Sequence, residues 1–467
     1  MTDAEIRNLF AGASDFEART LRSGENSIYG YFIDGLVASS FIADYIYKPV
    51  VQDLPLPMVD AYNTALRGGI YNAVARPCKK LADVADKLVN GFCVVLFPGV
   101  GAIAFEVRTG IGRGPGAPDV ENTVKGPKDA FVETIRINTS LIRRHLHTPD
   151  LRIEGQIVGR RSLTSVCVVW IEGITNPVLV RKMHDRLKSI RIDAMLSPAS
   201  VEEYVTGSRK TAFPLLQYTE RPDRFCQGLL DGRVGLLVDG LPLAYLAPAT
   251  IGYLMESPED RSRDYISASC VRILRYGALG ISLLLPAVYI AMVMFHQQYL
   301  PPKLLDTILN TEQIRPFTTA AEVLGLLVAY ELLQETGIHL PQSIGQSVSV
   351  IGGVVVGTAA VEAGLIAPMV LIVVSFTGVC GFVLPNRDLA QAVRVWRFGI
   401  GLLGMWFGLR GVAAGTGILL YHLSKIRCLG ISYLSFAPGG RGILRRRLKE
   451  ERYRDEKLSP EDRKNQK

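Results

Sequence analysis

Hydrophobic and polar positions follow two different patterns in the two halves of the chain, which has 467 residues. Residues 28 to about 250 alternate short apolar runs with amphipathic stretches, a pattern typical of an α/β fold. Beyond residue 271 the apolar runs become long enough to cross the roughly 30 Å hydrocarbon core of a membrane as helices. The pattern predicts an α/β soluble N-terminal half followed by an all-α polytopic membrane domain.

The α/β half contains an internal repeat. Segments 31–46 and 169–184 share one layout: a β-rich run, an acidic residue followed by glycine, and a helix. Segments 88–105 and 229–246 align without a gap, and each predicts a hairpin entered from a helix, because Pro-Gly or Asp-Gly separates two apolar runs. We therefore expect two similar subdomains, with a helical segment at 129–147 between them.

The repeat and the later change of pattern together predict six segments along the chain. In order, these are an N-terminal extension at 1–26, a first α/β subdomain at 27–128, a helical connector at 129–160, a second α/β subdomain at 161–265, a membrane domain at 266–436 and a basic cytoplasmic tail at 437–467.

The formal net charge of +8 is concentrated at the C-terminal end of the chain. Residues 441–467 carry eleven Lys and Arg against six Asp and Glu, so this segment alone contributes +5. Beside a membrane span, such a tail marks the cytoplasmic side and contacts anionic membrane lipid. Nucleic acid is not expected as a partner, because no recognition motif accompanies the charge.

The cysteines and the N-terminus indicate a reducing compartment. The seven cysteines are scattered without a CxxC pair or a nearby histidine cluster, which argues against a zinc site and against a disulfide framework. The first thirty residues lack the apolar core and the cleavage site of a signal peptide. We expect reduced, buried thiols, no metal, and an N-terminus in the cytoplasm.

Candidate chemistry in the α/β half is sparse. Glycines at 110–116 would let backbone N–H groups approach an anion, but prolines follow where a helix should begin, which favours a flexible loop. His145 and His147, beside Arg143 and Arg144, do not share a helix face, which favours a solvated basic face over a metal or anion site. The chain has no Ser/His/Asp set, Cys/His set or P-loop. We therefore expect neither an enzyme nor a cofactor.

Five apolar stretches follow one another in the second half, at 276–295, 320–337, 339–364, 368–385 and 396–423. The second is short and carries three glutamates, so we expect an interfacial or re-entrant helix there rather than a crossing. Four spans then leave both termini in the cytoplasm, but they put Arg387, Arg394 and Arg397 on the outer side, against the positive-inside rule. Arg410 interrupts the last span, where a central arginine needs a partner or a water-filled cavity.

The stretch 339–364 has one face of polar and small residues. Projected as a helix, this face holds Gln342, Gln346, Ser349, Gly353, Gly357, Ala360 and Gly364. Two interpretations remain open: the face lines an ion path at the axis of an oligomer, or it packs closely against another helix. Glu362 lies off this face near one end, where structural and gating roles are equally compatible with the sequence. The candidate intramembrane charges are Glu322, Glu331, Glu362 and Arg410.

Several long blocks carry a family resemblance. They include IDGLVASSFIADYIYKPV, YTERPDR, DGRVGLLVDGLPLAYLAPAT, LLLPAVYIA and LPQSIGQSVSVIGGVVVGTAAVEAGLIAP. In order and spacing, from about residue 27 to 435, they resemble the A subunits of the nutrient germinant receptors of spore-forming bacteria, the GerA family. Arg410 and the tail beyond Ala437 depart from the family pattern.

The resemblance implies a cytosolic two-part N-terminal domain and a membrane domain in the spore inner membrane, with both termini facing the cytoplasm or core. It also implies assembly with B-type and C-type receptor subunits, and a homo-oligomer of A subunits that conducts ions when nutrients trigger germination. A sister branch, the stage V sporulation AF proteins, shares much of the pattern. Its members would be channel or scaffold subunits that amplify germination without binding nutrients. The segment RPFTTAAEVLGLLVAYELLQETGIHLP is more similar to the receptors, which favours the receptor branch.

Overall fold

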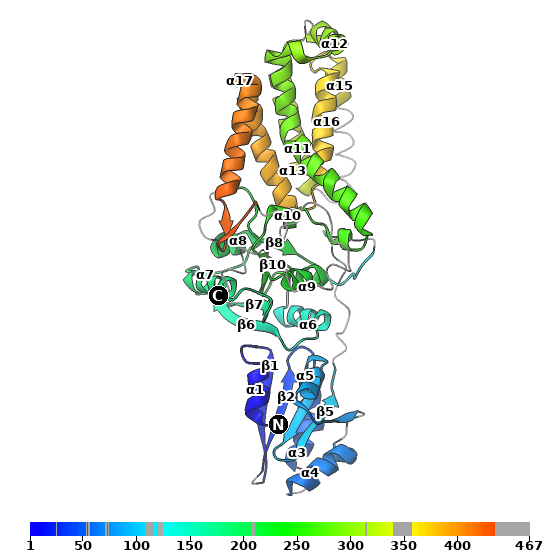
Figure 1. Cartoon of the computed structure of the whole chain (residues 1–467), viewed down its shortest axis with the longest axis vertical. Coiled ribbons are helices and arrows are strands. Elements are labelled where there is room, and N and C mark those ends of the chain that lie inside the picture. The colour runs from blue at the N-terminus through cyan, green and yellow to red at the C-terminus, as the bar shows by residue number, and fades with distance from the viewer. Residues whose placement is uncertain are drawn as a thin grey trace.

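The structure is a computed structural model of the whole chain, and its parts lie in a row along one long axis (Figure 1). A first sheet lies at one end, a second sheet in the middle and a group of long helices at the other end. The structure describes residues 1–434 except 25, 53, 55–56, 71, 73, 109–115, 117, 119–120, 122, 124, 207–210, 313–314 and 340–356.

The first sheet has five antiparallel strands in the order β1-β2-β4-β5-β3: β1 Phe16–Ser23, β2 Asn26–Ile33, β4 Phe92–Phe97, β5 Gly101–Glu106 and β3 Ala75–Cys78. Its helices are α1 Asp3–Leu9, α2 Ser39–Ile42, α3 Lys48–Gln52, α4 Met58–Thr64 and α5 Leu81–Val89, with the π-helical turns η1 Ala43–Tyr47 and η2 Ala65–Gly69. Every residue of β4 is buried, because helices cover both faces of the sheet.

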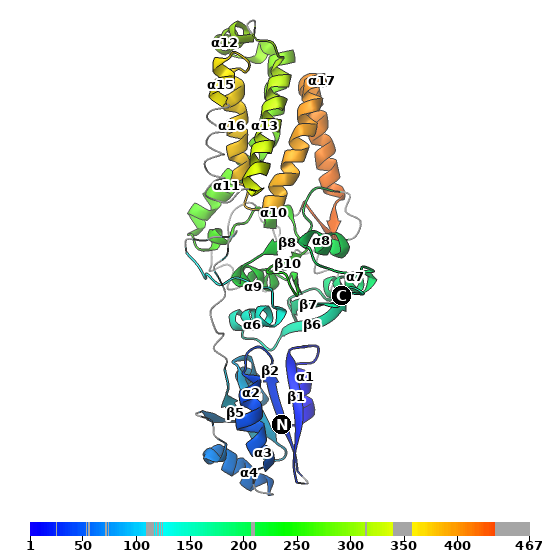
Figure 2. The same ribbon diagram turned by 180° about the vertical axis from the view of Figure 1, so that it is seen from behind.

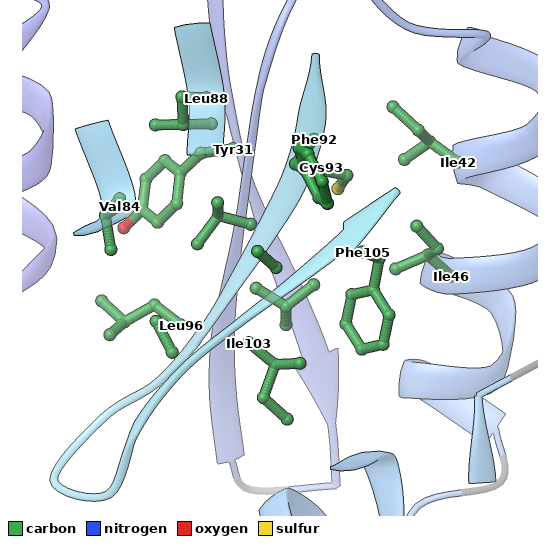
Figure 3. Close-up of a cluster of buried hydrophobic side chains, with 14 of the residues drawn as sticks. Tyr31, Ile42, Ile46, Val84, Leu88, Phe92, Cys93, Leu96, Ile103 and Phe105 are labelled. Atoms are coloured by element: carbon green, nitrogen blue, oxygen red, sulfur yellow. The ribbon is translucent and has the colours of Figure 1, made fainter. Parts of the chain in front are cut away.

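Figure 3 shows how these two faces are packed. Val84 and Leu88 of α5 lie beside Tyr31 on one face, and Ile42 and Ile46 lie beside Phe105 on the other. This core explains why the sequence of β4 reads as a continuous apolar run rather than an alternating one.

The second sheet repeats the topology of the first. Its five antiparallel strands have the order β6-β7-β9-β10-β8: β6 Leu151–Val158, β7 Thr164–Ile171, β9 Val234–Val238, β10 Ala244–Ala247 and β8 Gln217–Thr219. Its helices are α6 Ile135–His145, α7 Pro177–Ser189, α8 Pro198–Thr206, α9 Pro222–Leu230 and α10 Ile251–Leu254, with the short turn η3 Pro258–Arg261. The predicted internal repeat and both predicted hairpins are confirmed.

The matched turn glycines have a physical reason. Gly99 and Gly240 close the two hairpins with φ of +79° and +83°, and Gly35 and Gly173 follow the matched acidic residues with φ of +86° and +79°. Residues other than glycine rarely adopt this left-handed conformation. The repeat therefore keeps glycine where the backbone turns.

Two expected boundaries are wrong. The segment expected as an extension at 1–26 forms α1 and β1, and β1 pairs with β2 along its whole length. The segment expected as a connector at 129–160 supplies α6 and β6 to the second sheet and its core. Both missed strands are edge strands on which only some positions are buried, so their sequences lack a continuous apolar run.

The two subdomains are joined by a buried ion pair. Arg143 on α6 donates from Nε and Nη2 to the two carboxylate oxygens of Asp15, at 2.8 and 2.9 Å. The side chains are 0% and 7% exposed. The solvated basic face expected around Arg143 is therefore wrong for this residue, which lies inside the interface.

His145 on the same helix holds the chain that enters the second subdomain. Its Nε2 lies 2.8 Å from Asp129 Oδ2, and this hydrogen bond raises the pKa of His145 and lowers the pKa of Asp129. No group of three or more His, Cys, Asp or Glu suited to a metal occurs among the described residues.

The His145–Asp129 pair predicts a pH-dependent stability. Because the folded pKa of His145 is raised, its contribution is complete below the ordinary pKa of about 6.5 and is lost as pH rises through the raised value. The contribution of Asp129 is complete above about 3.9 and is lost as pH falls through its lowered folded pKa. We expect His145→Gln to remove about 1 kcal/mol of stability at pH 6 and much less at pH 8.5. Urea titrations of the detergent-solubilised chain at the two pH values measure this, and an equal loss at both would contradict it.

The helical part begins and ends at the second subdomain. Its helices are α11 Tyr265–Phe295, α12 Pro302–Glu312, α13 Thr319–His339, α15 Gly357–Glu362, α16 Pro368–Phe382 and α17 Arg387–Lys425, with the turn η4 Gln297–Tyr299. The chain then returns in a small hairpin, β11 Arg427–Cys428 and β12 Ile431–Ser432, which packs on the second subdomain. Lys182 of α7 donates to the carbonyl of Leu429 at 3.0 Å.

The last apolar stretch is two helices rather than one span. Within α17, Gly408 has φ +61° and ψ −144°, which is not helical, and Figure 1 shows two arms meeting at the end farthest from the sheets. The arms pack closely because glycines face the opposite arm: a Cβ on Gly411 would overlap the Leu403 carbonyl, and one on Gly404 would lie 3.2 Å from Val412. The expectation of one span at 396–423 is therefore wrong.

The short stretch expected as an interfacial helix also runs the length of the helical part. Glu322, near the start of α13, contacts Ala367 at the start of α16, and Tyr330 farther along contacts Phe382 at its end. The helix has 21 residues, about 32 Å. Figure 2 shows it between α16 and α17. The segment is therefore one long helix packed among the others, and its residues Glu322 and Glu331 have arginine partners in the helical part.

Candidate functional site

The second subdomain and the helical part share one continuous apolar core, which we call the junction. Phe213, Leu215 and Leu254 of the subdomain belong to the same buried cluster as Leu389 and Leu423 of α17. Backbone contact reinforces it, since the Ile251 N–H donates to the Tyr433 carbonyl at 2.9 Å. The second subdomain and the two helices α11 and α17 are therefore held together by close-packed side chains.

A buried carboxylate ties the junction to α11. Asp260, in η3, is 0% exposed and accepts from Arg275 at 2.6 Å and from Arg272 at 3.4 Å. Arg272 also pairs with Glu256 at 3.1 Å. Because breaking a buried pair leaves an uncompensated charge, the first turns of α11 are held firmly to the second subdomain.

A buried amide pair ties the junction to α17. Asn386 is the N-cap of α17, accepting from the Leu389 N–H at 2.8 Å, and its Nδ2 donates to Gln217 Oε1 of β8 at 3.1 Å. Gln217 and Asn386 are 1% and 3% exposed. A cavity of about 140 Å³ adjoins them, lined among others by Glu121, Arg224 and Arg387. The edge strand of the second sheet is thus hydrogen-bonded to the N-cap residue of a long helix.

Glu331 joins α13 to the first arm of α17. It accepts from Arg397 at 2.7 Å and from Arg394 at 3.1 Å. Arg397 is 1% exposed, and its Nε has no partner among the described residues. The hydroxyl of Tyr330 and Oε1 of Gln334 are likewise buried without a described partner. This polar cluster lies on the sheet side of the helical part, where α13 approaches its end.

We expect a measurable coupling between Glu331 and Arg397. Polar contacts between membrane helices stabilise them by about 1 kcal/mol, so a cycle of Glu331→Gln, Arg397→Gln and the double variant should give a coupling of about that size. Thermal unfolding of the detergent-solubilised chain measures it. A coupling indistinguishable from zero would show that the pair does not hold α13 to α17.

The other two acidic candidates lie at the far end. Glu322 is 4% exposed, accepts both Nη1 bonds of Arg315 at 2.8 and 2.9 Å, and accepts from the Ala367 N–H at 2.9 Å. It therefore fastens the start of α16. Glu362 is exposed at the last residue of α15, so its position agrees with the expected location near one end.

Arg410 lies at the start of the second arm of α17 and not in the middle of one continuous helix. It is exposed and follows the turn at Gly408, where a Cβ would meet His296 and Phe295 at the end of α11. An arginine at the end of a helix reaches the membrane surface at low cost. The turn between the two arms of α17 therefore explains why an arginine, Arg410, occurs in the last apolar stretch.

The predicted small and polar face falls partly outside the described residues: this is so for Gln342, Gln346, Ser349 and Gly353. Of the remainder, Gly357 is buried, and a Cβ there would lie 3.4 Å from Leu371 of α16. Ala360 is half-buried. Gly364 has φ +67° in the turn after α15, so its place in the sequence is explained by the turn rather than by a helix face. The expectation that Gly364 lies on a helix is wrong.

Sequence reasoning did not identify the junction residues. Gln217, Asp260 and Asn386 lie in short segments with ordinary polar composition, and no spacing rule connects them. Two weak signals were present: Asn386 precedes a long apolar helix as a cap, and Ser257 with Asp260 has the spacing of a capping box.

The comparisons with known proteins agree on one family. The model of the family described as Bacillus/Clostridium GerA spore germination protein matches residues 4–456. The chain is 34% identical over 430 residues to a protein of Bacillus subtilis (strain 168) named uncharacterized membrane protein YfkQ, covering 91% of this chain and 83% of that one. It is 35% identical to spore germination protein A1 of the same organism, covering 78% and 76% of the two chains.

A solved structure is also similar. It is the crystal structure of the N-terminal domain of the A subunit of the Bacillus megaterium spore germinant receptor GerK3, which is 25% identical. The similarity covers 53% of this chain and 93% of that one, with a TM-score of 0.41.

Proposed function

The chain belongs to the GerA spore germination protein family of Bacillus and Clostridium, and on this premise we propose that it is a receptor subunit that couples nutrient sensing to ion release across the spore inner membrane. The observation that carries the proposal is the junction. Gln217 and Asp260 of the second sheet domain bind the first turns of α17 and α11 directly, through Asn386 and Arg275. A signal received by the sheets therefore has a rigid route to the helices.

A membrane location is supported by the helices themselves. Two of the described helical segments, α11 and α17, are long and apolar enough to cross a membrane by length and composition, and α17 is folded at Gly408 into two arms. Exposed aromatic side chains gather near both ends, as in proteins that sit in a bilayer: Tyr299, Trp406 and Phe407 at the far end and Tyr421 near the sheets.

We propose six crossings, with the sheets in the cytoplasm. His339 ends α13 on the sheet side, whereas Gly357 opens α15 beside the start of α16. His339 and Gly357 thus lie toward opposite ends of the helical part, so the chain between them accounts for one of the proposed crossings. The two arms of α17 add a further pair of crossings. This arrangement puts Arg387, Arg394 and Arg397 on the cytoplasmic side, and so it removes the conflict with the positive-inside rule.

The proposed topology predicts opposite labelling of two positions on α17. In membrane vesicles of one known orientation, Arg410→Cys should react with a membrane-impermeant maleimide from the outer side only, and Lys425→Cys from the cytoplasmic side only. The background is a chain in which exposed Cys270 is replaced by serine. Reaction of both positions from the same side would contradict the proposal that the second arm of α17 crosses the membrane.

We further propose assembly with B-type and C-type receptor subunits and a homo-oligomer whose axis carries the ions. The segment 339–364 is the proposed lining, and Gly357 and Ala360 are the members of its small and polar face that the structure describes on a helix. Their place supports the proposal: Gly357 packs on α16, and the segment follows α13, which Glu331 fixes to α17.

Deletion of the gene in spores tests the proposal. Potassium release after addition of the matching nutrient should be lost and should return with the wild-type gene. Release at the wild-type rate in the deletion strain, tested with every nutrient to which the parent responds, would refute the receptor role. Such a result would leave the sister-branch role as an amplifier.

A further inference from the structure

The second sheet has an open edge beside a basic helix, and this combination suggests a docking surface. Strand β6 is the outermost strand, paired only with β7. In Figure 1 it lies next to α7, on the side of the second sheet nearest the first subdomain. An exposed strand edge offers unpaired N–H and C=O groups to another extended chain.

The register identifies which backbone groups face outward. The Glu172 N–H donates to the Asp150 carbonyl at 2.9 Å, so even-numbered residues of β6 bond to β7. Odd-numbered residues therefore face the outer edge. Ser14 of the first subdomain caps the Ile153 carbonyl at 2.7 Å. Gly155, beside which Ser14 also packs, and Ile157 have no outward backbone hydrogen-bond partner among the described residues, so the edge is open from Gly155 onward.

A groove runs along this free edge, between β6 and α7. One section, of about 420 Å³, is lined by Glu154, Gln156, Arg181, His184, Asp185 and Lys188. A second, of about 270 Å³, continues past Val158 to Arg160 and Arg191. Oε1 of Gln156 is buried without a described hydrogen-bond partner, which leaves an acceptor available inside the groove.

Charge and side-chain alternation define what the groove accepts. Four cationic side chains (Arg160, Arg181, Lys188, Arg191) face two carboxylates (Glu154, Asp185), a net charge of +2. An added strand would turn alternate side chains toward α7 and the others toward the side of Ile157, which is 65% exposed. The side chains that point toward α7 meet the cationic residues of the groove. The side chains on the other side meet the exposed apolar side chain of Ile157.

We propose that the edge of β6 binds an extended acidic segment of a partner protein by strand addition. The preferred sequence alternates acidic and β-branched residues, with backbone hydrogen bonds to Gly155 and Ile157. The basic tail of the chain is a poor occupant, because its net positive charge matches that of the groove.

The test uses a fluorescent nine-residue peptide of alternating Glu and Val and the full chain in detergent. Fluorescence anisotropy should show saturable binding, and Lys188→Glu should weaken it about tenfold by placing a like charge in the groove. Arg186→Glu is the matched control, because Arg186 is exposed on the same helix but outside the groove, and it should change binding less than twofold. Equal losses in the two variants, or no saturable binding, would overturn the proposal.

Hydrogen exchange separates strand addition from charge attraction. Bound peptide should slow the exchange of the Gly155 and Ile157 amides at least tenfold, and leave the buried strand β9 unchanged. Unchanged exchange at both amides would show adsorption to α7 alone. A doubling of molecular mass by light scattering without peptide, with slowed exchange at the same amides, would assign the edge to a second copy of this chain. Either result refutes the acidic-peptide proposal and leaves the proposed receptor function untouched.

Discussion

Replacing Arg143 by alanine is expected to lower the free energy of opening between the two sheet subdomains by about 3–5 kcal/mol. The reason is that Asp15 would stay buried without its partner, since the two side chains are 0% and 7% exposed in the intact pair. Hydrogen exchange of β1 and β6 in the detergent-solubilised chain measures the opening, because these strands flank the ion pair.

Arg136 supplies the matched control for this prediction. It pairs with Asp34 across the same interface, but the two side chains are 54% and 35% exposed. Exposed pairs stabilise by about 0–1 kcal/mol, so Arg136→Ala should have a small effect. Comparable losses in both variants would show that burial does not determine the strength of this interface.

Replacing Gln217 by methionine is expected to slow nutrient-triggered potassium release from spores about tenfold, at normal protein level. Methionine keeps the volume of the side chain but removes the acceptor that Asn386 uses, and so it weakens the connection between β8 and α17. The buried amide left unpaired costs about 1–3 kcal/mol, an energy that shifts the balance between two conformations by about fivefold to more than a hundredfold.

Gln217→Glu distinguishes coupling from a general loss of stability. Burial favours the protonated form of the carboxyl group introduced there. Its carbonyl oxygen can accept from Asn386, and its hydroxyl can donate to the Tyr218 carbonyl as Nε2 of Gln217 does, so release should stay within about twofold of wild type if the hydrogen bond transmits the signal. If the methionine variant released potassium at the wild-type rate, the amide pair would have no part in coupling. The cap of α17 is intact in both variants, because the Leu389 N–H bonds to Asn386 itself.

The parts of the fold that the sequence predicts well are those buried on both faces. Strands β4 and β9 are buried at every position, so their apolar runs and the turn glycines at 99 and 240 are visible without a structure. Edge strands β1 and β6 were missed because only some of their side chains are buried. The apolar pattern of a sequence reflects which positions are buried, and an edge strand has few buried positions.

The helical part is harder to predict from the sequence, because the sequence shows a charged residue without showing its partner. Glu322 and Glu331 made α13 look unsuited to cross, but Arg315, Arg394 and Arg397 neutralise them from segments 7 to 66 residues away. The turn at Gly408 was hidden because the same stretch is rich in glycine, and a turn glycine then has no distinct signature. Arg410 was the only visible sign of it.

Reconstitution tests whether this chain carries the released ions. The purified chain, together with B-type and C-type subunits, is placed in liposomes loaded with potassium, and efflux is followed after addition of the matching nutrient. We expect nutrient-dependent efflux that requires this chain and falls about tenfold with Gln217→Met. Efflux equal to that of liposomes holding only the other two subunits would contradict the claim that the helical part of this chain carries the ions.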